Sequence, residues 1–118
     1  MIVSIKSTNI TNITESTRDY LDEKIVKLVE KLFKKEEELI KLDLEVGRIT
    51  RHHKQGKVFR AEANLSIGSR NLYADAVGEE LSEAIDLLEE ELEKEIKKFK
   101  EKRTAQERQG ARVFKSKR

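Results

Sequence analysis

The residues best suited to chemistry are two adjacent histidines, His52 and His53, in a basic segment of this 118-residue chain. Adjacent histidines lack the helical i, i+4 spacing that places two imidazoles on one metal ion. No cysteine or clustered carboxylate nearby completes a ligand set, and the surrounding Arg and Lys would repel a cation. The pair favours a solvated loop or a phosphate contact over a metal site, and we predict neither metal nor cofactor.

Other catalytic arrangements are missing from the sequence. The five glycines fall singly at turns, so there is no P-loop or dinucleotide fingerprint, and no serine lies in a Gly-x-Ser-x-Gly context. Paired acids occur in the C-terminal half, but on an exposed helical face with lysines among them. Screened carboxylates of that kind are poorly suited to general acid–base catalysis. We therefore predict no catalytic residue, no small-molecule substrate and no enzymatic activity.

Clustered cations are the remaining candidates. The 25 basic and 23 acidic residues leave a net charge of only +2, so attraction to nucleic acid depends on how the cations are arranged. Each Lys or Arg placed on a phosphate displaces condensed counterions without reading base identity. In a chain with 41% charged residues, a lysine-rich flank is more often only a solvated face.

The element that positions most of these cations is a strand turning into one long amphipathic helix, residues 72–103. Its apolar residues recur at steps of three or four: Leu81, Ile85, Leu88, Leu92, Ile96 and Phe99. Acids dominate the start of this helix and cations its end, which complements the helix macrodipole. We expect the apolar stripe to be buried against a sheet.

A second amphipathic helix is predicted over residues 15–35, with Thr14 as its N-cap. Its apolar stripe consists of Leu21, Ile25, Leu28 and Leu32. At about 100° per residue, the lysines that share an arc beside this stripe are Lys24, Lys27, Lys31, Lys34 and Lys35. This helix therefore has a basic flank.

Period-two alternation predicts strands at residues 2–5, 40–46, 59–67 and 72–76, with a long basic hairpin loop at 48–57. The element order is β-α-β-β-β-α. Two helices with one stripe each and a sheet with one apolar face predict a two-layer α+β sandwich. In it, a four-stranded mixed sheet carries both helices on one face, and the first helix joins two parallel strands.

One domain, residues 1–103, is expected, followed by a flexible basic tail at 104–118, where the apolar period ends. The chain has no cysteine, which excludes disulfide and thiolate chemistry. The N-terminus has no continuous apolar run, which predicts neither a signal peptide nor a membrane span, so the cytoplasm is the expected location.

These elements bring the cations together if both helices lie on one side of the sheet. The lysine flank of the first helix and the cationic end of the last then face one solvent region, with the basic loop at one end. The predicted RNA-binding residues are Lys24, Lys27, Lys31, Arg51, Lys54, Lys94, Lys98 and Lys102. Packing explains the few aromatic residues, so the sequence predicts a binder of structured RNA rather than a stacking platform for single strands.

Two segments of the sequence carry a family resemblance through their order and spacing. The first is Ile-Thr-Glu-Ser-Thr-Arg-Asp-Tyr-Leu-Asp-Glu-Lys at 13–24, continuing through Lys27-Leu28. The second is Ala-Ile-Asp-Leu-Leu at 84–88, followed by 92–96 and 98–102. Over about residues 1–103 the chain resembles the ribosome hibernation promoting factor family. That family is also called ribosome-associated inhibitor A and, historically, sigma-54 modulation protein.

The resemblance implies a non-enzymatic protein that binds 16S-type rRNA of the small ribosomal subunit, in the channel for messenger and transfer RNA. It implies silencing of translation in starved or stationary cells by steric blockage, with no membrane contact and a monomer off the ribosome. Carried over by position, the RNA-facing residues fall on Lys24, Lys27, Lys94, Lys98 and Lys102. The chain departs from its relatives where they commonly have a lysine and a glutamine, since it has Glu91 and Glu95 there, and Ser82 replaces a tyrosine.

Alternatives to this interpretation stay open at the level of sequence. A protein-interaction module docking through the Glu-rich start of the last helix is the rival, supported by the near-zero net charge. An end at Arg118 resembles the short class of the family, and a truncated longer member would look the same. Silencing of single ribosomes and pairing of ribosomes are both compatible with the sequence.

Overall fold

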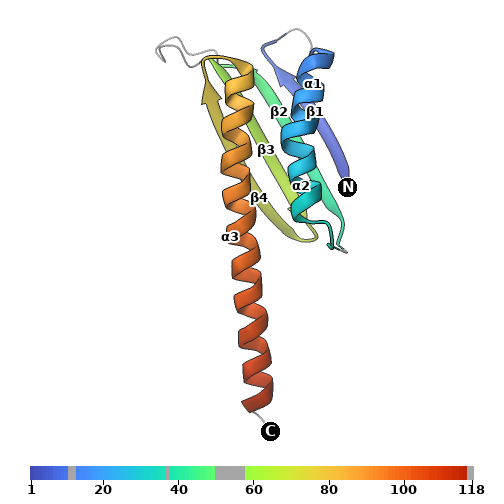
Figure 1. Ribbon diagram of the computed structural model, residues 1–118, viewed down its shortest axis with the longest axis vertical. Coiled ribbons are helices and arrows are strands. Elements are labelled where there is room, and N and C mark those ends of the chain that lie inside the picture. The colour runs from blue at the N-terminus through green and yellow to red at the C-terminus, as the bar shows by residue number, and fades with distance from the viewer. Residues whose placement is uncertain (11–12, 37, 50–57, 117–118) are drawn as a thin grey trace.

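Four strands and two helical segments make up the part of the chain that the computed structural model describes. That part is residues 1–10, 13–36, 38–49 and 58–116, without the side chains of 107–116. The elements are β1 (Ile2–Thr8), α1 (Glu15–Leu21), η1 (Asp22–Val26), α2 (Lys27–Leu32), β2 (Ile40–Arg48), β3 (Phe59–Ile67), β4 (Arg70–Gly78) and α3 (Leu81–Ser116). The first helical segment, formed by α1, η1 and α2, and the second, formed by α3, cover the same face of the sheet (Figure 1). The predicted α+β sandwich and its element order are confirmed.

The sheet has the order β1-β2-β3-β4, with β1 and β2 parallel and the other pairs antiparallel. Its register places Leu44, Ala63 and Ala74 in one row across three strands. These side chains are buried on the helical face, as are Leu42 and Val46 on β2. Because alanine side chains are short, the helices can approach the middle of the sheet closely.

The first helical segment begins as the sequence predicts. The Thr14 side-chain oxygen accepts the Thr17 backbone N–H at 3.1 Å and caps α1. The segment then contains η1, one π-helical turn, in which the Lys27 N–H donates to the Asp22 carbonyl five residues earlier. A single uninterrupted α-helix, which the sequence predicted, is therefore wrong at this turn.

The π-helical turn changes which side chains face the core. The buried residues of the segment are Leu21, Ile25, Val26, Val29 and Phe33. Leu28 and Leu32, which the sequence assigned to the stripe, are only partly buried. Because a π-turn holds more residues than an α-turn, the apolar face rotates after Ile25, and Val26 is buried in addition.

The predicted stripe on α3 is buried at Ile85, Leu88, Leu92, Ile96 and Phe99, whereas Leu81 is only partly buried. Beyond the stripe, α3 continues to Ser116 and projects past the end of the sheet (Figure 1). The predicted end of the helix at Arg103 is therefore wrong. The apolar period does end there, but its loss removes only the contact with the sheet. The following residues include no proline, and most favour a helix.

Leu88 and its neighbour Leu87 provide a direct test of this packing. Leu88 is 0% exposed, whereas Leu87 is 38% exposed on the same helix. We expect Leu88→Ala to lower the free energy of unfolding by about 2–5 kcal/mol, because it leaves a cavity against the sheet. Leu87→Ala should change it much less. Urea denaturation of the two variants measures the difference, and equal losses would contradict the packing.

Candidate nucleic-acid interface

The lysines of the first helical segment lie on η1 and α2. Lys24 is half-buried in η1, and its ammonium lies 5.7 Å from the centre of the Tyr20 ring. Lys27 and Lys31 lie on α2 and are exposed to solvent. A cation over an aromatic face is attracted by the ring quadrupole, so Tyr20 restricts where the Lys24 ammonium can point.

Tyr20 also fixes the first segment against α3. Its hydroxyl donates a hydrogen bond to the Asp86 carboxylate of α3. This bond, together with burial and the nearby charges of Glu89 and Glu23, raises the pKa of Tyr20 to about 12. The flank of α3 that faces Lys24 is consequently acidic.

The lysines in the middle of α3 lie in a row of exposed ion pairs. Lys94 pairs with Glu91 at 3.4 Å, and Lys98 pairs with Glu95 at 3.7 Å, in each case one turn earlier on the helix. Their side chains are 67% and 75% exposed. Exposed pairs of this kind contribute about 0–1 kcal/mol, so both ammonium groups can exchange a glutamate for a phosphate at small cost.

Two cationic side chains in the basic part of α3 bind other groups of the same protein. Lys100 donates to the Leu32 carbonyl, which closes the C-terminal end of α2. Arg103 donates to the Glu36 carboxylate at 2.7 Å. The Arg103 partner and burial act in opposite directions on the pKa of Glu36, and the arginine prevails, so that pKa is lowered.

Two aromatic rings support the same cluster. The Phe33 and Phe99 ring centres are 6.2 Å apart, with Lys100 over the first ring and Arg103 over the second. Lys100 and Arg103 therefore hold α2 against α3, and they are less suited to bind a ligand than the exposed lysines of the same helix.

The predicted cations consequently fall on two flanks of α3 instead of one continuous surface. Lys24 lies on the side where Tyr20 meets Asp86, and Lys100 faces α2 on that same side. Lys98 and Lys102 line a hollow beside the start of β4. Two further predicted contacts, Arg51 and Lys54, lie with His52 and His53 outside the described residues.

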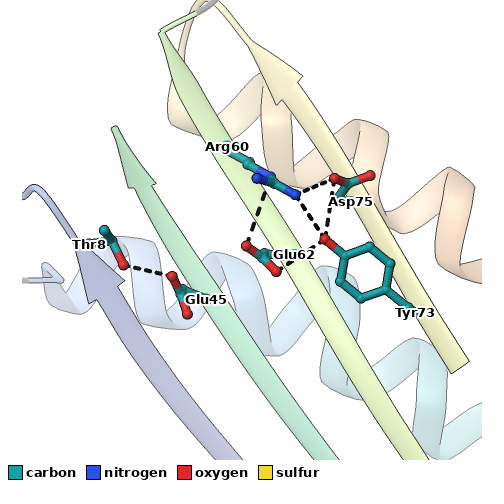
Figure 2. A network of polar contacts seen from close by, with 6 residues as sticks. All are labelled: Thr8, Glu45, Arg60, Glu62, Tyr73 and Asp75. Carbon is teal, nitrogen blue, oxygen red and sulfur yellow. Dashed lines mark hydrogen bonds and ion pairs between the residues drawn. The ribbon is translucent and has the colours of Figure 1, made fainter. Parts of the chain in front are cut away.

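The uncovered face of the sheet carries a polar network that the sequence analysis did not identify. Arg60 donates to Asp75 at 2.6 Å and to the Tyr73 hydroxyl at 2.9 Å, and the Tyr73 hydroxyl donates to Glu62 at 3.1 Å (Figure 2). Burial and Glu62 raise the pKa of Tyr73. Thr8 donates to Glu45 nearby.

Strand register is the reason that this network escaped the sequence analysis. Alternation places Arg60 and Glu62 on the outer face, but only the pairing of β3 with β4 sets Asp75 opposite Glu62. Since Glu45 is opposite Glu62 on the other side, three carboxylates form one row across the sheet. Such a row would repel a phosphate group.

The described residues contain no group of three or more His, Cys, Asp or Glu arranged to hold a metal ion. None of the helices in the same part of the chain combines the length and the apolar character that a membrane crossing requires.

Comparison with known proteins identifies both a family and solved relatives. Residues 3–104 match the model of the family described as Sigma 54 modulation protein / S30EA ribosomal protein. The Protein Y N-terminal domain of Thermus thermophilus is similar, with a TM-score of 0.62 and 21% identity, over 84% of this chain and 99% of that one. A ribosomal subunit interface protein from Coxiella burnetii has a TM-score of 0.60 and 17% identity, over 85% and 98%. At these sequence identities, the similarity to the two structures shows a common fold and nothing further.

The bond between Tyr20 and Asp86 can be tested by titration. We expect Asp86→Asn to lower the pKa of Tyr20 from about 12 toward its ordinary value of 10.0, because it removes the charged acceptor. A Tyr73→Phe background leaves Tyr20 as the one tyrosine, so ultraviolet absorbance reports it alone. In the wild type, stability from this bond is present below pH 10 and lost as the pH rises through about 12. Glu90→Gln, a neutralised carboxylate on the exposed side of α3, serves as control, and an equal effect there would contradict the assignment.

The Glu36–Arg103 pair predicts a pH dependence of the opposite sign. A lowered carboxyl pKa stabilises the fold above the ordinary value of 4.5, and this contribution is lost as the pH falls through the lowered pKa. We therefore expect Glu36→Gln to lose less stability than the wild type between pH 7 and pH 3. Urea midpoints at the two pH values provide the measurement. Glu30→Gln on α2 should behave like the wild type, and parallel losses in all three proteins would disprove the role of this pair.

Proposed function

The chain belongs to the Sigma 54 modulation protein / S30EA ribosomal protein family, and from this membership we propose that it is a ribosome hibernation factor. In this proposal it binds the rRNA of the small ribosomal subunit in the channel for messenger and transfer RNA. The observation that carries the proposal is the family match over residues 3–104, which spans the whole α+β unit. The name of one structural neighbour, a ribosomal subunit interface protein, agrees with it.

The exposed lysines supply the chemistry of binding. Lys27 and Lys31 on α2, and Lys94 and Lys98 on α3, present ammonium groups to solvent from helices that are packed on one sheet. Phosphates of a folded RNA accept such groups without base readout, and each contact releases condensed counterions. Lys24 contributes from a position restrained by the Tyr20 ring. Lys102 on α3 is also exposed, and with Arg51 and Lys54 from the segment between β2 and β3 it completes the proposed set.

In this proposal, the bound protein blocks translation by occupying the site of messenger and transfer RNA. The protein measures 29 Å by 19 Å across its two shorter axes, and in this proposal it occupies the channel in which RNA otherwise lies. No bond is made or broken, so the proposed activity is binding without turnover. The helical side faces the rRNA, and the row of carboxylates on the open sheet face points away from it. A cytoplasmic monomer that meets ribosomes in stationary or stressed cells fits this role.

The rival function is a protein-interaction module that docks through the acidic start of α3. Glu79, Glu80 and Glu83 are exposed there, and Leu87 is an exposed apolar side chain one turn further on. Co-sedimentation with purified small subunits in low salt separates the two functions. A protein that stays in the supernatant and captures a single protein partner would overturn hibernation and support the rival.

Charge reversal tests the proposed RNA surface. We expect the combined substitutions Lys27→Glu, Lys94→Glu and Lys98→Glu to abolish binding to small subunits, because three phosphate contacts become repulsive. In the wild type, each lysine on a phosphate should contribute about 0.7–0.9 to the slope of log K against log salt. Binding is measured by co-sedimentation at two salt concentrations, with circular dichroism as the folding control.

The matched control reverses charges elsewhere on the same protein. Glu79→Lys with Glu80→Lys should leave binding unweakened, because these carboxylates directly precede α3 and lie away from the lysine row. Normal binding of the triple lysine variant would show that the helices are not the RNA-facing surface, even though the family assignment stands.

A further inference from the structure

A hollow between the β3–β4 turn and α3 combines several cations with polar side chains. Its lining includes Ser69, Arg70, Asn71, Lys98, Phe99 and Lys102. The turn that forms one wall depends on Gly68, whose φ of 59° is reached without strain because glycine has no Cβ. Three of the lining residues, Ser69 to Asn71, are therefore held on a tight hairpin opposite the helix.

Arg70 is fixed at the rim of this hollow by two contacts. Its guanidinium carbon lies 5.8 Å from the centre of the Phe99 ring, and its Nη2 donates to Gln106 at 3.2 Å. A guanidinium group has five N–H donors, so these contacts leave several of them for a ligand. An arginine that is already stacked loses little conformational freedom on binding.

The side chains of the turn divide between the two faces of the sheet. Asn71 is paired with Ser66, and its side-chain oxygen accepts a hydrogen bond from the Ser66 hydroxyl at 2.8 Å, so this amide lies on the open sheet face, away from α3. Arg70 is paired with Ile67 and therefore lies on the helical face. Ser69 adds a hydroxyl to the hollow from the turn.

The charge of the hollow is positive. Arg70, Lys98 and Lys102 give three positive charges against the one carboxylate of Glu95, a balance of 3 − 1 = +2. Glu95 lies 3.7 Å from Lys98 and competes with any anion that enters. A group with one or two negative charges and several acceptor oxygens is the ligand that this arrangement matches.

Two other depressions of the described surface differ in this respect. One, over the open sheet face, is lined by Glu45, Glu62 and Asp75 beside Arg60. The other lies at the end of α2, where Lys100 and Arg103 are bonded to the Leu32 carbonyl and to Glu36. The hollow at Arg70 has both an excess of cations and N–H donors of Arg70 that are available to a ligand.

We propose that this hollow binds a backbone phosphate of RNA, with Arg70 as its anchor and Lys98 and Lys102 completing the charge. Arg70 donates in bidentate fashion to the phosphate oxygens, and Ser69 donates from the turn. The proposal rests on the ribosome-binding function proposed above and extends it, since Arg70 and the turn lie outside the lysine rows of the two helices. It makes the β3–β4 turn part of the RNA surface.

Opposite charge changes at the hollow provide the test. We expect Arg70→Gln to weaken binding to small subunits about tenfold in low salt, as loss of a charged hydrogen bond does, and to lower the salt slope by about 0.7–0.9. Lys102→Gln, which touches no packed ring, should act in the same direction. Glu95→Gln should tighten binding, because it removes the competing carboxylate.

Matched controls carry the same charge changes at distant exposed positions. Lys6→Gln on β1 and Glu79→Gln before α3 should leave the affinity within about twofold, since screening weakens charges beyond about 10 Å. A second arm adds pyrophosphate to the free protein and follows the backbone amide signals of residues 69–72 by NMR. This arm separates a site for RNA phosphodiesters from one for free phosphate compounds.

Each outcome decides the proposal. Weaker binding by Arg70→Gln and Lys102→Gln, with unaffected controls, supports it. Unchanged binding by both variants while the wild type binds would overturn it and leave the ribosomal function intact. If pyrophosphate then shifts the amides of the turn, the hollow serves a free phosphate compound instead. Failure of the wild type to bind small subunits would overturn the ribosomal function and this extension together.

Discussion

The packing of the α3 stripe on the small-residue face of the sheet is the constraint on which the rest of the structure depends. Leu88 and Leu92 are fully buried over strands whose inward side chains include Ala63 and Ala74. Short side chains below and branched ones above bring the helix close to the sheet and exclude water from the contact. With one flank of α3 committed to the core, the orientation of every other residue on that helix follows from its position in the sequence. The lysines are therefore presented by a rigid element whose rotation is fixed.

The two sides of the sandwich consequently have different chemistry. The helical side carries the exposed lysines and the hollow at Arg70, while the open sheet face carries a row of three carboxylates around Arg60. Since the net charge is only +2, this separation allows an almost neutral protein to offer phosphate a favourable surface and an unfavourable one. In the proposed function, charge would orient the protein on its RNA partner before any close contact forms.

The sequence predicted the elements well because their signals are local. Alternation in β2 and the spacing of Ile85, Leu88 and Leu92 report burial directly, and the structure confirms both. The π-turn was not predicted because Leu28 and Leu32, which an uninterrupted helix would bury, adjoin Val29 and Phe33, which the structure buries, so the sequence is compatible with either stripe. The contacts of Lys100 with the Leu32 carbonyl and of Arg103 with Glu36 were not predicted for a different reason. Whether a helical cation meets solvent or the carbonyl at the end of α2 depends on the docking of two elements distant in sequence, which periodicity does not contain.

The ion pairs along α3 explain how such a surface can be selective without reading bases. Each exposed lysine of the row already has a glutamate one turn away, so an isolated phosphate gains little by replacing it. The gain accumulates only where several phosphates meet several lysines at once, and that requires an RNA of matching shape. In the proposed function, the glutamates slightly reduce the contribution of each single lysine, so binding depends on several contacts made at once. Taken alone, a near-zero net charge argues against nucleic-acid binding. With the cations arranged in this way, it is compatible with the proposed binding to one folded RNA surface.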